Sequence, residues 1–390
     1  MKLLFIDGPS FGKADMIAAF EKQGLDIVLF WNDKLYERTN ELLENEVVDI
    51  MKNEDVSLVF SFNYYPLMSK CCQRAGVKYI SHVYDSPQNA LFSTTILNSC
   101  NYVFIFDKAM YLELKNGGIN TVYYLPMMAA ADRLDNLVVP ESAVDTVSSD
   151  VSFVGSMYNE KHNLYDRMYE NLDTYARGYL DGIIEAQLKV WGISFADKLL
   201  TDKIIECMYK SMPYQNQEDG AETLRYIYSN YFIARKVTSI ERQRLLKAVS
   251  ERFQLKLYTH NKPEDMPEAQ FMGPIDWEES MPAVFKHSRI NLNITLRSIQ
   301  TGIPLRAFDI MGAGGFLLSN YQEDFLDYFI PGEDFVYFED ENDMLLKIEY
   351  YLNHDKERKE IAFNGYEKVK KSHTYDARAE YMLKVAGNEI

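Results

Sequence analysis

Residues 2–62 read KLLFIDGPSFGKADMIAAFEKQGLDIVLFWNDKLYERTNELLENEVVDIMKNEDVSLVFSF, and this stretch decides the fold class. It contains three short apolar runs, rich in Val, Ile, Leu and Phe, whose length and composition predict buried strands. The runs are 2–7, 26–31 and 56–62. Amphipathic segments at 16–23 and 41–52 separate them and predict helices. This regular alternation predicts a parallel sheet with helices on both faces.

The same pattern organises the rest of the chain into two α/β domains. Three more runs complete the first series, at 77–85, 102–107 and 121–126. Residues 131–150, with a Val-Pro pair and a Ser/Asp cluster, then predict a connection between domains. A second series follows at 151–155, 254–260, 290–294, 315–319 and 335–338. We therefore expect Rossmann-like domains at 1–135 and 150–372, and a C-terminal helix at 373–390 that packs back on the first domain.

The second domain is expected to carry a helical insertion. Residues 158–252 lie between its first two strands and are rich in helix-forming residues. Within this segment, Thr238 and Glu241 have the spacing of a capping box, which predicts that a helix begins at Thr238.

The composition excludes several classes of protein. A net charge of −17 repels phosphate backbones, so no nucleic-acid partner is expected. No apolar run reaches the roughly 18 residues of a spanning helix, and the first run is too short for a signal peptide. Four cysteines without a CxxC pair indicate reduced thiols in a cytoplasmic protein and no metal site.

Open α/β sheets bind ligands beyond the carboxyl ends of their strands, so residues that follow strands are the candidates for function. Asp7 follows the first strand, in a turn one residue too short for a phosphate-binding P-loop. His82 and Asp85 lie at the end of the fourth strand, and both can titrate. Gly155 and Ser156 end the first strand of the second domain.

The segment 294–320, ITLRSIQTGIPLRAFDIMGAGGFLLSN, is the densest in candidate residues. A polar loop is followed by a helix that is predicted to start near Leu305. A helix N-terminus after a glycine turn is a natural anion site, and an arginine adds charge-assisted hydrogen bonds to a diphosphate. The candidates here are Arg297, Thr301, Gly302, Ile303, Arg306 and Asp309. The acidic run at 339–343 instead predicts a turn and helix cap, not a metal site.

Three C-terminal stretches together resemble the CgeB-like bacterial glycosyltransferases, which are related to the group 1 glycosyltransferases. These are PLRAFDIMGAGGFLLSN from Pro304, GEDFVY from Gly332 and SHTYDARA from Ser372. HVYDSP, CNYVFIFDK and VYYLPMMA resemble the uncharacterised N-terminal domain that often accompanies this family.

The resemblance implies an α/β, GT-B fold, in which two Rossmann-like domains face each other across a cleft. It implies transfer of a sugar from a UDP- or GDP-type nucleotide-sugar, which is a substrate and not a cofactor, to a hydroxyl of a protein or cell-surface glycan. It also implies that no metal and no stable membrane insertion are needed. Asp85, His82 or Asp7 would then be the acceptor-side base, and Asp309 is suited to bind a ribose hydroxyl.

This sequence departs from the family in one respect. Group 1 retaining enzymes usually carry two glutamates eight positions apart, but Asp309 stands at the second position and Thr301 or Gly302 at the first. The stereochemical outcome therefore stays open. Two other readings also stay open: a non-catalytic binding module on the same scaffold, and an NAD-dependent enzyme, which the absence of GxGxxG disfavours.

Overall fold

A computed structural model describes residues 1–160 and 163–387, and the chain divides into two compact units. Unit 1 contains Met1–Met128, the short segment Gln215–Glu222 and the chain from His373 on. Unit 2 contains Ala129–Tyr214 and Thr223–Ser372. The chain therefore passes between the units four times, so neither unit is one continuous piece of sequence.

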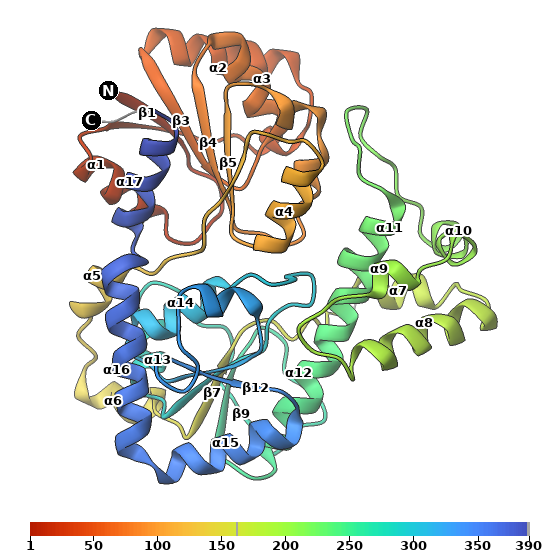
Figure 1. Cartoon of the computed structure of the whole chain (residues 1–390), viewed down its shortest axis with the longest axis vertical. Coiled ribbons are helices and arrows are strands. Elements are labelled where there is room, and N and C mark those ends of the chain that lie inside the picture. The colour runs from red at the N-terminus through yellow and green to blue at the C-terminus, as the bar shows by residue number, and fades with distance from the viewer. Residues whose placement is uncertain (161–162, 388–390) are drawn as a thin grey trace. The chain divides into compact units, whose positions relative to one another are not determined.

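Unit 1 is built on a six-stranded parallel sheet with the strand order β2-β1-β3-β4-β5-β6 (Figure 1). The strands are β1 (Lys2–Ile6), β2 (Asp26–Phe30), β3 (Val56–Phe62), β4 (Lys78–Val83), β5 (Asn101–Ile105) and β6 (Val122–Tyr124). Leu4 of β1 lies opposite Val28 of β2 and Val59 of β3. All six strands predicted for this part of the chain are confirmed.

Helices cover both faces of this sheet. They are α1 (Lys13–Lys22), η1 (Asp33–Tyr36), α2 (Glu41–Asn53), α3 (Pro66–Ala75), η2 (Asn89–Phe92), η3 (Thr94–Leu97), α4 (Lys108–Asn116) and α17 (Tyr375–Val385). Successive side chains of each strand point to opposite faces of the sheet. Leu4 and Val59 belong to the core beneath α2, α3 and α4, whereas Phe60 packs against Phe20 of α1 on the other face. Helices α1 and α17 pack together.

Gly12 begins α1 with a left-handed backbone, φ 72°. A Cβ at this position would lie 1.8 Å from the Tyr375 hydroxyl of α17. Both the φ angle and this close approach require glycine. The turn after β1 is therefore shaped to pack against α17, and it is no phosphate loop.

The segment Gln215–Glu222 docks on the region after β4 through backbone and side-chain contacts. Ala221 donates its N–H to the Phe92 carbonyl (2.8 Å), and Thr94 donates to the Asp219 carbonyl (3.0 Å). The buried guanidinium of Arg38 pairs with Asp219 (3.3 Å) and with the fully buried carboxylate of Glu222 (3.2 Å). Sequence reasoning missed this contact, because it joins residues about 180 positions apart.

Unit 2 contains a second six-stranded parallel sheet, with the order β12-β11-β10-β7-β8-β9. Its strands are β7 (Val151–Val154), β8 (Leu255–Tyr258), β9 (Gln270–Phe271), β10 (Ile290–Asn293), β11 (Leu317–Asn320) and β12 (Val336–Phe338). Five of these were predicted. The sequence did not predict β9, because it is a two-residue edge strand with both residues exposed and lacks an apolar run.

The helices of unit 2 include those of the predicted insertion. They are α5 (Ala131–Asp135), α6 (Glu141–Val147), α7 (Leu164–Tyr169), α8 (Thr174–Gln187), α9 (Ala196–Leu199), α10 (Asp202–Ser211), α11 (Leu224–Ile227), η4 (Tyr228–Ile233), α12 (Ala234–Ser250), α13 (Ser280–His287), α14 (Leu305–Gly312), η5 (Glu323–Asp327), α15 (Glu341–Asn353) and α16 (Asp355–Ser372). Between β7 and β8 the described residues form helices and loops, with a hydrophobic core of their own.

Two details of the sequence analysis are wrong. The expected connection at 131–150 contains two helices, α5 and α6, that belong to unit 2. Thr238 does not begin a helix, because α12 already starts at Ala234 and follows α11 and the π-helical turn η4 directly. Inside α12, the Thr238 hydroxyl donates to the Ala234 carbonyl (2.8 Å), which is the usual bond of a mid-helix threonine.

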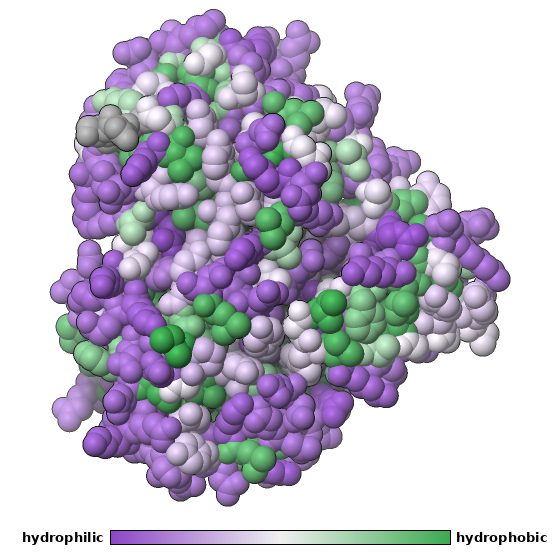
Figure 2. Space-filling model, viewed as in Figure 1, coloured by the Kyte–Doolittle hydropathy of each residue, from purple (hydrophilic) through white to green (hydrophobic). Residues whose placement is uncertain are grey.

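Figure 2 shows a face that is largely hydrophilic, with apolar surface over the helical insertion and in smaller patches elsewhere. Within the described residues, none of the helices combines the length and the apolar character that crossing a lipid bilayer requires.

We expect Arg38→Ala to destabilise unit 1 by about 3–5 kcal/mol, because it removes the cation that compensates two largely buried carboxylates. Urea unfolding measures the loss, and limited proteolysis should show faster cleavage at 215–222. Arg74→Ala is the matched control, since its ion pair with Glu44 is partly exposed and should contribute less than about 1 kcal/mol. Equal effects of the two substitutions would contradict the role of Arg38.

Candidate functional site

The candidate anion site in unit 2 lies at the start of α14. As predicted, this helix begins at Leu305, and Pro304 precedes it without a side-chain cap. The loop before it is held by two hydrogen bonds: Gln322 Nε2 donates to the Gly302 carbonyl (3.1 Å), and the Asp324 N–H donates to the Thr301 carbonyl (3.0 Å). Gly302 and Ile303 are buried. An uncapped N-terminus on a fixed loop presents backbone N–H groups to an anion.

Arg306 lies in the first turn of α14 and is half-buried. Its guanidinium donates to the thioether of Met281 (2.7 Å) and lies 5.7 Å from the ring centre of Phe285. Burial lowers the pKa of this arginine. Among the described residues it forms no ion pair with a carboxylate, so its charge is available to a ligand.

Arg242 of α12 completes the cationic part of the site, and the sequence analysis missed it. Its buried guanidinium donates from Nε to the Ile294 carbonyl (3.0 Å) and from Nη1 to the Ser156 carbonyl. It also lies 5.1 Å from the ring centre of Tyr158. Arg242 lies close enough to Arg306 to lower its pKa further. Nothing in the sequence linked a residue of the insertion to strands about 50 and 90 positions away.

Gly155 and Ser156 shape the loop after β7. The Gly155 N–H donates to the Tyr258 carbonyl (3.0 Å), which continues the pairing of β7 with β8. The Ser156 hydroxyl accepts from the Tyr158 N–H (3.0 Å) and donates to Glu160 (3.3 Å). Tyr158 itself adopts φ 50°, a left-handed conformation that is uncommon for a bulky residue and here turns the loop. These bonds place the Tyr158 ring beneath Arg242.

The structure gives Arg297 a different role from the one expected. Its guanidinium forms a two-point ion pair with Glu241 of α12, donates to the Val190 carbonyl (3.0 Å) and lies 4.3 Å from the ring centre of Trp191. All of these groups are buried or partly buried. Because its donors are already engaged, Arg297 joins the loop after β10 to the insertion and is poorly suited to bind phosphate.

Asp309 is buried on α14 and accepts a hydrogen bond from the indole of Trp277 (3.3 Å). Its charge raises the pKa of Arg306 against the effect of burial, so the two side chains interact electrostatically. The helix therefore combines a cation in its first turn with an acceptor one turn later.

In unit 1, Asp85 is the most accessible of the three candidate bases. It is exposed just beyond β4 and accepts from Asn63 Nδ2 (2.8 Å). The Asn63 side-chain oxygen in turn accepts the N–H groups of Tyr84 (2.9 Å) and Asp85 (3.1 Å). Asn63 has φ 62°, which asparagine tolerates better than most residues. This arrangement holds the carboxylate at the carboxyl end of the sheet.

His82 is fully buried on the face of the sheet that α1 and α17 cover. Its Nε2 lies 3.3 Å from the Leu125 carbonyl, and burial together with Arg378 lowers the pKa of the ring to about 3. A buried, neutral imidazole does not reach an acceptor at the surface. Its placement therefore disfavours His82 as the base, although the strand-end position is as expected.

Asp7 lies after β1, as expected, and pairs with Lys13 at 2.6 Å, both side chains being partly exposed. A carboxylate held by a lysine this close has a preformed partner for its charge. Proton transfer to Asp7 would break that pair, which disfavours Asp7 as the base.

The acidic run at 339–343 forms a helix cap. The Asp340 side chain accepts the Asp343 N–H (2.8 Å), and Asp343 accepts from Lys347 (2.7 Å). In the described part of the chain, His, Cys, Asp and Glu side chains form no group of three that could hold a metal ion.

Comparison with known proteins relates both the sequence and the fold to glycosyltransferases. Residues 235–384 match the family described as "Glycosyl transferase-like". No curated protein matches the sequence.

The whole chain is similar in structure to proteins of the GT-B type. HepE from Anabaena in complex with UDP-glucose superposes with a TM-score of 0.55 at 10% identity, covering 100% of both chains. The E. coli trehalose-6-phosphate protein bound with UDP-2-fluoro glucose gives 0.58 at 9% identity, covering 100% of both chains. Sucrose-phosphate synthase from Thermosynechococcus elongatus gives 0.52 at 12%, covering 99% of this chain and 98% of the other. At these identities the likeness establishes the fold.

We expect the stability of the protein to fall as pH drops from about 7 to 5. Burial and Arg378 lower the pKa of His82 and of His373 to about 3, whereas an unfolded histidine has a pKa near 6.5. In this window the unfolded chain binds more protons, so each histidine contributes a slope that approaches about 1.4 kcal/mol per pH unit below pH 6.5. Urea unfolding across this range should show a shallower slope for His82→Gln; an unchanged slope would contradict the assignment.

Proposed function

We propose that this protein, a glycosyltransferase of the GT-B fold, transfers a sugar from a UDP- or GDP-type donor to a hydroxyl of a protein or cell-surface glycan, without a metal ion. The main observation behind the proposal is the pair Arg242 and Arg306 beside the uncapped start of α14. Neither arginine forms an ion pair with a carboxylate among the described residues. Two cations in this state suit a diphosphate.

The proposed donor site follows from these contacts. Departure of the nucleotide leaves negative charge on the diphosphate, which Arg306 and the N–H groups of α14 would stabilise without a metal. Arg242 would set the position of the loop after β7 and add its charge. Gly302 and Ile303 would bring the backbone close to the phosphates, and Asp309 would accept a hydroxyl of the ribose. Structural neighbours that hold UDP or UDP-sugars support the choice of donor.

For the acceptor, Asp85 is the base that we favour. An inverting transfer needs a group that takes the proton of the attacking hydroxyl, and a positioned carboxylate can do so. Asp85 is exposed and oriented by Asn63, whereas His82 is buried and Asp7 is paired with Lys13. A retaining transfer would need no such base. The CgeB-like character of the motifs at 304–320 and 332–337 is part of this proposal.

We expect Arg306→Ala to weaken binding of UDP by about 1.5–3 kcal/mol, because one charge-assisted contact to the diphosphate is lost. Calorimetry with UDP and GDP measures the loss, with and without EDTA. Arg244→Ala on α12 is the matched control, since its ion pair with Glu341 is largely exposed, and it should bind nucleotide normally. Unchanged affinity of Arg306→Ala for both nucleotides, or binding abolished by EDTA, would refute the site.

For an inverting enzyme, we expect Asp85→Asn to keep donor affinity and to lose on the order of 10²–10⁴ in transfer rate, as is typical when a general base is removed. Donor binding and turnover are measured separately. Asn63→Ala should lower the rate by a smaller factor, because it removes the orienting hydrogen bonds and leaves the carboxylate. Near-normal turnover of Asp85→Asn would move the mechanism to retention or to Asp7.

A further inference from the structure

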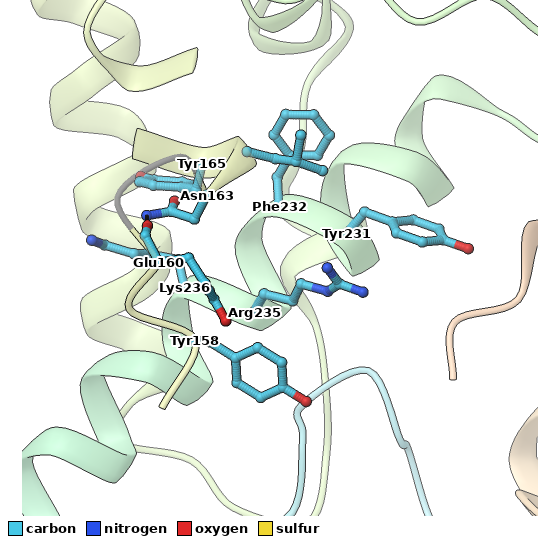
Figure 3. Close-up of a pocket in the computed structure, with 9 residues that line it drawn as sticks. Tyr158, Glu160, Asn163, Tyr165, Tyr231, Phe232, Arg235 and Lys236 are labelled. Carbon is cyan, nitrogen blue, oxygen red and sulfur yellow. Dashed lines mark hydrogen bonds between the residues drawn. The ribbon is translucent and has the colours of Figure 1, made fainter. Parts of the chain in front are cut away.

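A pocket lies where the helical insertion meets the loop after β7, and Figure 3 shows its lining. Its volume is about 250 Å³. Ligand sites for drug-sized molecules usually occupy about 300–1,000 Å³. The pocket therefore has room for a ring-sized group but not for a whole nucleotide-sugar.

Aromatic side chains dominate this pocket. Tyr158 comes from the loop after β7, Tyr165 from α7, and Tyr231 and Phe232 from the π-helical turn η4. A π-helical turn inside a longer helix costs regular hydrogen bonding and occurs frequently at functional sites. Sugar rings present flat C–H faces that pack on aromatic rings, so this lining suits a carbohydrate.

Arg235 supplies the main polar group. It is exposed on α12, and its guanidinium lies 5.7 Å from the ring centre of Tyr231 and 6.0 Å from that of Tyr158. Figure 3 shows its side chain extending between these two rings. Within the described residues it forms no ion pair with a carboxylate. Its flat array of N–H donors matches neighbouring hydroxyls or a carboxylate on a sugar.

The other charged groups of the lining are largely satisfied. Lys236 pairs with Asp166 (2.7 Å), and Asn163 caps α7 by accepting the Asp166 N–H (2.8 Å). The carboxylate of Glu160 accepts a hydrogen bond from the Ser156 hydroxyl (3.3 Å) through one oxygen, which leaves acceptor capacity for a ligand. The pocket thus offers one donor group, one acceptor group and several aromatic faces.

We propose that this pocket binds one sugar ring of the acceptor glycan. The assignment to the acceptor rests on the proposed function, in which the donor sugar hangs from a diphosphate at α14. No described residue of α14 or of the loop at 294–304 lines the pocket, whereas the insertion supplies most of the lining. In this proposal the insertion therefore selects the acceptor.

The test uses the full chain and saturation-transfer NMR with methyl glucoside, N-acetylglucosamine and glucuronate, each with and without saturating UDP. We expect at least one of these sugars to bind, with or without UDP. Arg235→Gln and Tyr231→Ala should each reduce the signal at least tenfold while leaving UDP binding intact. Tyr175→Ala, on the exposed surface of α8, is the matched aromatic control and should bind sugar like the unmodified protein.

Arg235 is exposed, so its substitution tests the pocket without threatening the fold. The proposal that this pocket binds a sugar would be refuted if none of the three sugars binds, or if binding is unchanged in both variants. If UDP-glucose abolishes sugar binding but UDP does not, the pocket binds the sugar of the donor, and the assignment to the acceptor is wrong. Sugar binding without any UDP binding would leave the pocket as a carbohydrate site and refute the proposed donor site instead.

Discussion

The buried guanidinium of Arg242 joins three parts of unit 2 that are distant in sequence. From α12 it donates to the Ser156 carbonyl in the loop after β7 and to the Ile294 carbonyl just after β10, and it lies 5.1 Å from the ring centre of Tyr158. Burying a charge is costly unless its hydrogen bonds are satisfied, and two strand-end carbonyls satisfy it here. The position of the loop after β7, of α12 and of the loop that leads to α14 depends on this one group. The proposed donor site and the proposed sugar pocket meet at the same Tyr158 ring.

Three arginines in this region show how local partners decide what a charge can do. Arg297 faces Glu241 in a buried two-point pair, so its donors are committed and its role is to hold the insertion to the strand ends. Arg242 is bonded to backbone carbonyls, which fix its position, and it forms no ion pair with a carboxylate among the described residues. Arg306 donates to a thioether and forms no ion pair with a carboxylate among the described residues, which leaves further N–H donors for a ligand. Sequence alone ranks these residues by motif and position, and it ranked Arg297 beside Arg306.

The insertion also links the two units through the chain itself. Its segment at 215–222 belongs to unit 1, where Arg38 pairs with Asp219 and Glu222. Such a buried pair is costly to break by removing one partner. On both sides of this segment the chain continues into unit 2, which contains the helices that line the proposed sugar pocket.

The sequence by itself determined the elements whose signal is local. Apolar runs predicted eleven strands because a parallel strand that is buried on both faces is mostly apolar along its short length, and the glycine–proline turn predicted the start of α14. The sequence did not predict the edge strand β9, because its two exposed residues do not form an apolar run. Strand ends correctly indicated where Asp85, Asp7 and Ser156 lie. Only the tertiary structure decided which of the candidate side chains are accessible: His82 is buried and Arg297 is paired with Glu241. It also placed Arg242, which the sequence did not indicate, near Arg306. The physical reason is that burial and hydrogen-bond partners depend on contacts between residues far apart in the chain, and a single sequence carries no local signal for them.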